Sequence, residues 1–184
     1  MIKVIISGGP CTGKTTLIEG LRDDLSSVHF IEEPATLVIE SEKEKEKLIE
    51  GYTGKFPWNN YRGFGPLVIQ KSVELENPTY KNKKISIQDR SLIDTIAYAR
   101  LNNCQHLIPI VHELIEQAGY NTAFICEPLN FYNQTENRAE TKDGALNTHK
   151  EICRAYQESR LKVHYLPQVD LESRLSLVKN ILKL

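Results

Sequence analysis

The sequence predicts an α/β fold built on a mainly parallel sheet, and three observations support this. Short apolar runs of four or five residues alternate along the chain with longer stretches of helical periodicity. The first run, Lys3–Ser7, holds three consecutive β-branched residues, as is typical of a strand buried on both faces. A glycine-rich turn, Gly8–Gly13, then leads into the first helical stretch. Strands and helices that alternate in this way form parallel sheets with helical crossovers.

The apolar pattern gives an expected range for each element. We expect five strands, over Lys3–Ser7, Val28–Ile31, Lys84–Gln88, Thr122–Cys126 and Val163–Leu166. We expect helices over Lys14–Leu25, Ala35–Glu50, most of Trp58–Glu76, Ser91–Leu101, Leu107–Ala118, Ala145–Arg160 and Asp170–Leu182. Apolar residues mark one face of the first helix, at Leu17, Ile18, Leu21 and Leu25, and of the last, at Leu171, Leu175, Val178 and Leu182.

Local signals mark the ends of several helices. Ser91 and Asp94 have the spacing of a capping box. Pro34 suits the first turn of a helix, and Gly51 suits the residue after its last turn. Between them the run Ser41–Lys47 alternates Glu and Lys, so that opposite charges meet at i,i+3. We expect this run to be a solvent-facing surface of the helix.

Length and composition indicate one domain and exclude several classes of protein. The 184 residues suit a single core, so we expect one domain over residues 1–184. A formal net charge of −1 provides no broad basic field for nucleic acid. The first apolar run is too short for a membrane span or a signal peptide. We therefore expect no nucleic-acid or membrane partner, and a cytoplasmic location.

The turn after the first strand matches the phosphate-binding motif G-x-x-x-x-G-K-[ST], in the strand–turn–helix context that the motif requires. Its glycines let backbone N–H groups approach phosphates, and the following helix presents its positive end. Lys14, expected to face solvent, would reach the β- and γ-phosphates of ATP or another NTP, and Thr15 would bind Mg²⁺. The expected nucleotide-binding residues are Gly8, Gly9, Pro10, Cys11, Thr12, Gly13, Lys14, Thr15 and Thr16.

Charged residues follow two strands at the edge of the sheet where α/β proteins bind ligands. Asp89 comes directly after the third strand and would help to bind Mg²⁺, while Arg90 suits a phosphate group. Glu32 and Glu33 end the second strand, and strand alternation directs only one of them to the site. We favour Glu33 as a general base toward a substrate hydroxyl, with Asp89 as the other candidate.

Two further segments supply candidate contacts. A polar segment at about 129–144 lacks an apolar period, so we expect a mobile lid there, in which Arg138 would stabilise charge on the transferred group. The stretch from Trp58 to Gln70 combines aromatic and amide side chains that suit an organic acceptor. With Glu33, the candidate substrate-binding residues are Trp58, Arg62 and Gln70.

With these motifs the chain resembles the P-loop kinase-like AAA-domain family, which is related to nucleoside and nucleotide kinases and to ribosylnicotinamide kinase. The resemblance extends over nearly the whole chain. ISGGPCTGKTTLIEGL is similar to the family's opening, QDRSLIDTIAYARL to its Asp-Arg strand and helix, and ENRAET to its lid. It implies a three-layer P-loop NTPase fold, with a five-stranded parallel sheet of order 2-3-1-4-5, helices on both faces and a short lid.

Two groups of kinases share further residues with this chain. Glu33-Pro34 and Asp89-Arg90-Ser91 are similar to deoxynucleoside kinases, which implies Glu33 as the base and Gln70 as a reader of the nucleobase. Asp89-Arg90 and Ala97-Tyr98 are similar to thymidylate kinases. However, the Gln that thymidylate kinases place next is Ala99 here, which argues against thymidylate as the substrate.

The leading functional hypothesis is an ATP- and Mg²⁺-dependent kinase that transfers the γ-phosphoryl group to a small molecule such as a nucleoside or nucleotide. One alternative is an NTPase or triphosphate hydrolase that uses water at the same site. A second is a nucleotide-dependent regulatory binding module. The acceptor, the preferred NTP and the choice between a monomer and a homodimer stay open.

Overall fold

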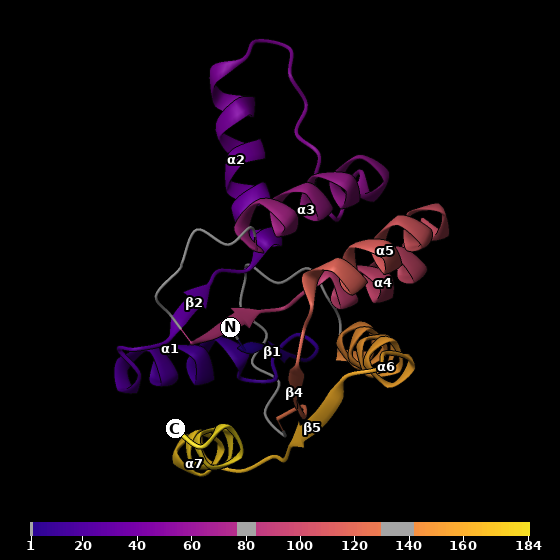
Figure 1. The fold of residues 1–184 in the computed structure, drawn as a ribbon. Helices are drawn as coiled ribbons and strands as arrows, with labels where there is room; N and C mark the ends of the chain where they lie inside the picture. The colour runs from indigo at the N-terminus through magenta and orange to yellow at the C-terminus, as the bar shows by residue number, and fades with distance from the viewer. Residues whose placement is uncertain (1, 77–83, 130–141) are drawn as a thin grey trace.

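A computed structural model describes residues 2–76, 84–129 and 142–184. Its five strands are β1 (Ile2–Ser7), β2 (His29–Ile31), β3 (Ile85–Asp89), β4 (Thr122–Cys126) and β5 (Lys162–Leu166). They form one sheet of order β2-β3-β1-β4-β5, and every pairing in it is parallel. The predicted fold class and strand order are therefore confirmed (Figure 1).

Seven α-helices follow the pattern expected from the sequence. They are α1 (Lys14–Asp24), α2 (Pro34–Leu48), α3 (Tyr61–Glu76), α4 (Leu92–Leu101), α5 (Ile108–Ala118), α6 (Lys142–Glu158) and α7 (Leu171–Leu182). A 3-10 turn, Gln105–Leu107, leads into α5. The capping box that Ser91 and Asp94 predict is present at the start of α4. None of the helices in the described ranges is long and apolar enough to cross a membrane.

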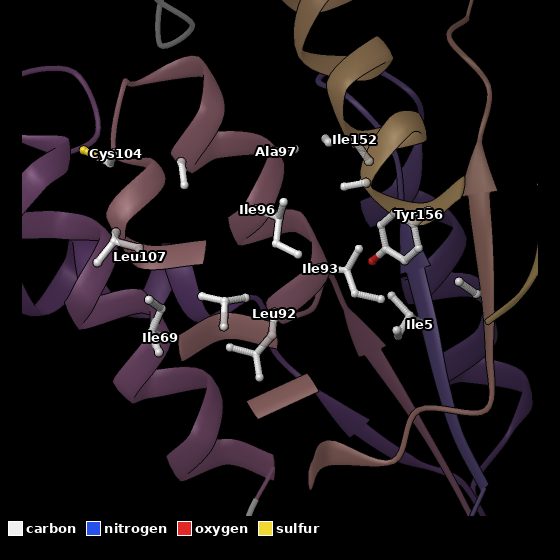
Figure 2. Packing of buried hydrophobic residues seen from close by; sticks show 14 of the residues in the cluster. Ile5, Ile69, Leu92, Ile93, Ile96, Ala97, Cys104, Leu107, Ile152 and Tyr156 are labelled. Atoms are coloured by element: carbon white, nitrogen blue, oxygen red, sulfur yellow. The ribbon is translucent and has the colours of Figure 1, made fainter. Parts of the chain in front are cut away.

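The core has two parts, one on each face of the sheet. Val4 and Ile6 of β1 pack with α1 and α7, whereas Ile5 between them packs with the helices of the opposite face. Figure 1 shows α1 and α7 on one side and α4, α5 and α6 on the other. Figure 2 shows Tyr156 of α6 beside Ile5 and Ile93, where the sheet, α4 and α6 meet. Both faces of β1 are thus fixed by packing.

Two expectations about local structure are wrong. Helix α6 begins at Lys142, three residues before the range expected, so the last residues of the expected lid belong to a helix. The charge run in α2 is not a fully solvated surface, because Glu42 is only 1% exposed. Burial alone would raise the pKa of Glu42. However, hydrogen bonds from Lys45, from Tyr52 and from the backbone N–H of Lys55 lower it to about 2.

Glu42 and its neighbour Glu46 anchor the loop between α2 and α3. The Tyr52 hydroxyl donates to Glu42 at 2.6 Å, and the backbone N–H of Gly54 donates to Glu46 at 2.7 Å. The same loop places Pro57 and Trp58 beside the site described below. The charge run therefore fixes a wall of that site as well as giving helix surface.

Candidate active site

The phosphate loop joins β1 to α1 and is built from backbone groups. Cys11 and Gly13 adopt positive φ angles of 60° and 78°. Gly8 passes so close to β4 that a Cβ atom there would lie 2.7 Å from the carbonyl oxygen of Cys126. Helix α1 begins at Lys14 with no side-chain cap and no acidic residue in its first turn. No acidic side chain of the cap or the first turn therefore competes for its N–H groups, as an anion-binding helix end requires.

Buried side chains from elements later in the chain hold this loop in place. Arg174 of α7 donates to the carbonyl oxygens of Thr12 at 2.5 Å, Glu127 at 3.0 Å and Pro167 at 2.9 Å. It thus ties the phosphate loop to the segments that follow β4 and β5. No motif in the sequence marks Arg174, since its partners are backbone atoms of distant residues.

His149 of α6 makes a second contact with the loop. Its Nδ1 accepts from the backbone N–H of Gly9 at 3.2 Å, and its Nε2 lies 3.3 Å from the Cys153 sulfur. Burial lowers the pKa of His149, so the ring is neutral at pH 7 and Nδ1 is able to accept. A Cβ atom on Gly9 would lie 2.6 Å from the Cβ of His149, so a residue other than glycine would displace the helix.

Lys14 is partly buried rather than solvent-facing, which corrects the expectation from the sequence. Burial and the Arg90 guanidinium lower its pKa, while the carboxylates of Asp89 and Glu33 act in the opposite direction. The ammonium group therefore stands at the meeting point of the loop with the ends of β2 and β3. It is the part of the phosphate loop that faces the charged residues predicted there.

Asp89 ends β3, beside Ile6 of β1, and is partly buried. Burial is the main cause that raises its pKa to about 6. Its Oδ1 atom is buried and has no hydrogen-bond partner among the described residues. Asp89, Thr15 and Glu33 line one groove of about 480 Å³, together with Glu32 and other residues. An unsatisfied carboxylate oxygen near a threonine hydroxyl suits a hard cation such as Mg²⁺.

The described residues contain no cluster of three or more His, Cys, Asp or Glu side chains that would hold a metal by itself. Mg²⁺ in nucleotide sites uses few protein ligands and completes its shell with phosphate oxygens and water. Thr15 and Asp89 therefore fit a cation that arrives with the nucleotide.

Arg90 connects the phosphate loop to the second part of the site. Its backbone has a φ of 63°, and the side chain is almost fully buried. Its Nε donates to Glu33 at 2.6 Å, and its Nη1 donates to Asp94 at 3.0 Å and to the carbonyl oxygen of Gly8 at 3.1 Å. The guanidinium also lies 5.6 Å from the ring centre of Tyr98. Two carboxylates therefore hold Arg90 in place.

Asp94 is a buried centre of hydrogen bonds that the sequence indicated only as a helix cap. Besides Arg90, it accepts from the Ser7 hydroxyl, from the backbone N–H of Ser91 at 2.9 Å and from the Tyr156 hydroxyl at 2.6 Å. These bonds connect β1, α4 and α6. Only the i,i+3 spacing to Ser91 was visible beforehand, because the other partners lie far away in sequence.

The structure distinguishes Glu33 from Glu32. Glu33 contacts Arg90 and also accepts from the Thr36 hydroxyl at 2.9 Å, whereas Glu32 is exposed. Burial tends to raise the pKa of Glu33, but Arg90 and Lys14 outweigh it and the pKa is lowered. Glu33 is therefore ionised at neutral pH and stands between the loop and the cavity described next.

A cavity of about 220 Å³ opens next to Glu33 and Arg90, among α2, α3 and α4. Its wall is mostly apolar or aromatic away from these two residues, and includes Ile39, Tyr61, Phe64, Val68 and Tyr98. A larger groove of about 710 Å³ runs along the phosphate loop toward Asn147 and Thr148 of α6. Pro57, Arg90 and Tyr98 line both spaces, so the cavity and the groove share one wall.

The candidate substrate residues are placed unequally. Glu33 lines the cavity, while Trp58 lines the phosphate groove, where it stacks on Phe56 and is 62% exposed. Arg62 and Gln70 are exposed and line neither space, and Gln70 donates instead to Glu74 at 2.8 Å. Arg138 and most of the expected lid lie outside the described residues.

Solved structures with this fold include two thymidylate kinases and a NadR protein. A thymidylate kinase from Candida albicans aligns with a TM-score of 0.67 and 13% identity, covering 99% of this chain and 91% of its own. One from Ehrlichia chaffeensis gives 0.66 and 20%, covering 100% and 98%. A NadR protein in complex with NR gives 0.72 and 20%, covering 99% of this chain and 49% of the NadR chain. These likenesses confirm the fold of P-loop kinases.

Comparison at the level of sequence gives the family. No curated protein sequence is significantly similar to the chain. The sequence model of a family described as "AAA domain" matches residues 3–174, which is nearly the whole chain. The protein therefore belongs to this AAA domain family, the P-loop kinase-like family that its motifs indicated.

Proposed function

We propose that the protein is a kinase that transfers the γ-phosphoryl group of ATP to a small molecule of the nucleoside or nucleotide type. One observation carries the proposal: a second cavity adjoins the phosphate loop, and Arg90 lines both spaces. A hydrolase that uses water needs no such cavity. Thymidylate kinases are among its structural neighbours, which supports the same class of reaction.

In this proposal the loop binds the triphosphate through its N–H groups, and the positive end of α1 faces the phosphates. Lys14 extends toward the β- and γ-phosphates and offsets the charge that develops during transfer. Thr15 and Asp89 would hold Mg²⁺, which when bound neutralises phosphate charge. Arg90, fixed by Glu33 and Asp94, orients Glu33 and adds positive charge near the transferred group.

Glu33 is the proposed general base, since it lines the cavity in which the acceptor would lie. Asp89 has a pKa of about 6, closer to the working pH, but it lines the groove with Thr15 and not the cavity. Geometry takes precedence over pKa in assigning a base, so we assign Asp89 to the cation. The cytoplasmic location of the protein stays a prediction.

The experiment is an acceptor screen with two readouts. The protein is mixed with ATP and Mg²⁺, and free phosphate and ADP are measured with and without each compound of a panel of nucleosides, nucleoside monophosphates and nicotinamide riboside. We expect little phosphate release alone, and ADP formation that depends on one compound. Fast release without an acceptor would establish the hydrolase instead, and binding without turnover would favour a regulatory module.

A further inference from the structure

We infer that the acceptor is an alcohol without a phosphate group of its own, that is, a nucleoside rather than a nucleotide. This inference rests on the proposed kinase function and specifies its substrate class. It follows from the charges in the wall of the acceptor cavity, which differ from those of the phosphate loop.

Three charged side chains line the cavity in the part of the chain that the structure describes: Glu33, Arg90 and Asp94. Arg90 is the basic one, and it is already paired with both carboxylates, at 2.6 Å and 3.0 Å. The three groups therefore sum to one negative charge. A phosphate that binds beside them would meet a paired guanidinium and an excess of carboxylate.

Both carboxylates already accept hydrogen bonds from the groups around them. Asp94 accepts from the Ser7 and Tyr156 hydroxyls, the Ser91 N–H and Arg90, which uses its acceptor positions fully. Glu33 accepts from Arg90 and Thr36. Because Arg90 and Lys14 lower the pKa of Glu33, this carboxylate stays ionised at neutral pH and would repel a phosphate oxygen.

Other basic side chains of the described residues do not supply the missing charge. Lys14 lines the groove along the phosphate loop, where the nucleotide triphosphate would use it. Arg62 follows Tyr61 in α3, but it is exposed and absent from the cavity wall. The cavity thus has no unpaired cation for a second phosphate among the residues described.

The rest of the wall suits an uncharged ring. Tyr61, Phe64 and Tyr98 supply aromatic surface, and Ile39 and Val68 supply aliphatic surface, within about 220 Å³. A ring packed among them leaves a hydroxyl group at the polar end of the cavity, next to Glu33. A nucleoside has this combination of a flat base and a terminal hydroxyl.

The reaction balances with this acceptor. The hydroxyl gives its proton to the Glu33 carboxylate, and its oxygen forms a bond to the γ-phosphorus of ATP. The bond between the γ-phosphorus and the oxygen that bridges to the β-phosphate breaks, and ADP leaves with that electron pair. The product is a phosphate monoester, which the negative cavity wall would help to expel.

The test compares each nucleoside with its own 5′-monophosphate, using thymidine, uridine, cytidine, adenosine, guanosine and nicotinamide riboside. We expect kcat/KM for the preferred nucleoside to exceed that for its monophosphate by at least about tenfold, because like charges at close range repel. Equal or better phosphorylation of the monophosphate would overturn the inference. If neither the nucleoside nor its monophosphate is phosphorylated, the proposed kinase function is contradicted. The preference of the cavity for an uncharged acceptor is then decided by binding measurements alone.

Binding is measured by calorimetry with the same pairs, in the wild type and in two variants. Glu33→Gln removes one negative charge from the cavity wall, and Glu32→Gln removes one from the neighbouring exposed position. We expect the preference for the nucleoside over the monophosphate to fall about fivefold or more in Glu33→Gln and to stay unchanged in Glu32→Gln. An unchanged preference in both variants, or a wild type that binds the monophosphate more tightly, would contradict the role of cavity charge.

Discussion

The phosphate loop and the acceptor cavity are built in different ways. The loop is one contiguous segment built mainly from backbone groups, so its residues are adjacent in sequence. The cavity consists of side chains from α2, α3 and α4, which come together only in the folded chain. The loop is a site for negative charge, whereas the cavity is apolar with a net negative end.

In the proposed reaction, the phosphate loop and the cavity therefore have different roles. A backbone site binds phosphate of any nucleotide, because it contacts the part that all nucleotides share. A side-chain cavity sets which second molecule is accepted, because its shape and charge are specific to these residues. Substitutions in the two halves should therefore affect different kinetic constants.

Substitution of the phosphate-loop lysine should have the largest effect. In Lys14→Met we expect kcat to fall by about a thousandfold, since a positive charge at the transferred group is lost. Steady-state kinetics and thermal melting of the same samples are the measurements. Lys43→Met, at an exposed position of α2, should keep wild-type turnover. Substantial turnover by Lys14→Met would contradict the assignment of the loop to the catalytic site.

Filling the acceptor cavity should separate its role from that of the loop. Val68→Phe adds a ring to the cavity wall, so we expect KM for the acceptor to rise by at least about tenfold, while KM for ATP changes less than about twofold. Val73→Phe serves as the control, because Val73 lies on the same helix but is 42% exposed. Equal increases in both Michaelis constants would mean that the cavity and the groove are not distinct subsites.

Asp89 lies on the nucleotide side, and its pKa allows a test of stability. Its pKa in the fold, about 6, is above the ordinary 3.8, so its contribution to stability is present below about pH 4 and is lost as the pH rises through 6. Asp89→Asn should therefore raise the free energy of unfolding of the nucleotide-free protein at pH 7.5, by about 1–2 kcal/mol.

The same substitution should change little near pH 3, where Asp89 is mostly protonated in both the folded and the unfolded state. Urea unfolding at both pH values is the measurement. Activity at pH 7.5 should be lost, since the proposed cation ligand is absent. A destabilised variant at pH 7.5 would show that Asp89 has a favourable partner in the fold.

The smallest effect concerns the loop that carries Pro57 and Trp58. Glu42→Ala leaves the hydroxyl of Tyr52 and the N–H of Lys55 without their acceptor, so we expect a loss of about 1 kcal/mol in the free energy of unfolding at pH 7. Because the pKa of Glu42 is lowered to about 2, the difference should persist at pH 5 and decline only as the pH falls below the ordinary 4.5.

The control for Glu42→Ala is Glu44→Ala, at an exposed position of the same charge run, which should alter stability by less than about 0.5 kcal/mol. Fluorescence of Trp58, the single tryptophan of the chain, should change in the Glu42 variant if the loop shifts. Identical behaviour of the two variants would mean that Glu42 does not hold the loop.

Most of the fold could be predicted from the sequence, because each element carries its own signal. The strand Thr122–Cys126 was predicted with both ends correct, and the Ser91–Asp94 capping box is present. These features depend on neighbours in sequence. The strand order needed more, since it came from a family resemblance and not from periodicity.

The candidate site was predictable only where its residues are marked by their neighbours in sequence. The loop, Asp89 and Glu33 lie next to strand ends, so their positions followed from the sheet. Gln70 and Arg62 have polar side chains that suit an organic acceptor, but their positions in α3 are exposed to solvent. The partners of Asp94 and Arg174 are far away in sequence, and Glu42 lies in a run whose composition is typical of exposed helix. Only tertiary packing distinguishes such residues.

The contacts of Arg174 bear on the order in which a growing chain becomes functional. The phosphate loop is synthesised well before α7, because the side chain that holds its Thr12 carbonyl is made some 160 residues later. Strand β1 also pairs with β3 and β4, which follow it at a distance. A nascent chain thus carries the complete motif long before the contacts that hold the loop can form, so the loop reaches its final arrangement only late in synthesis.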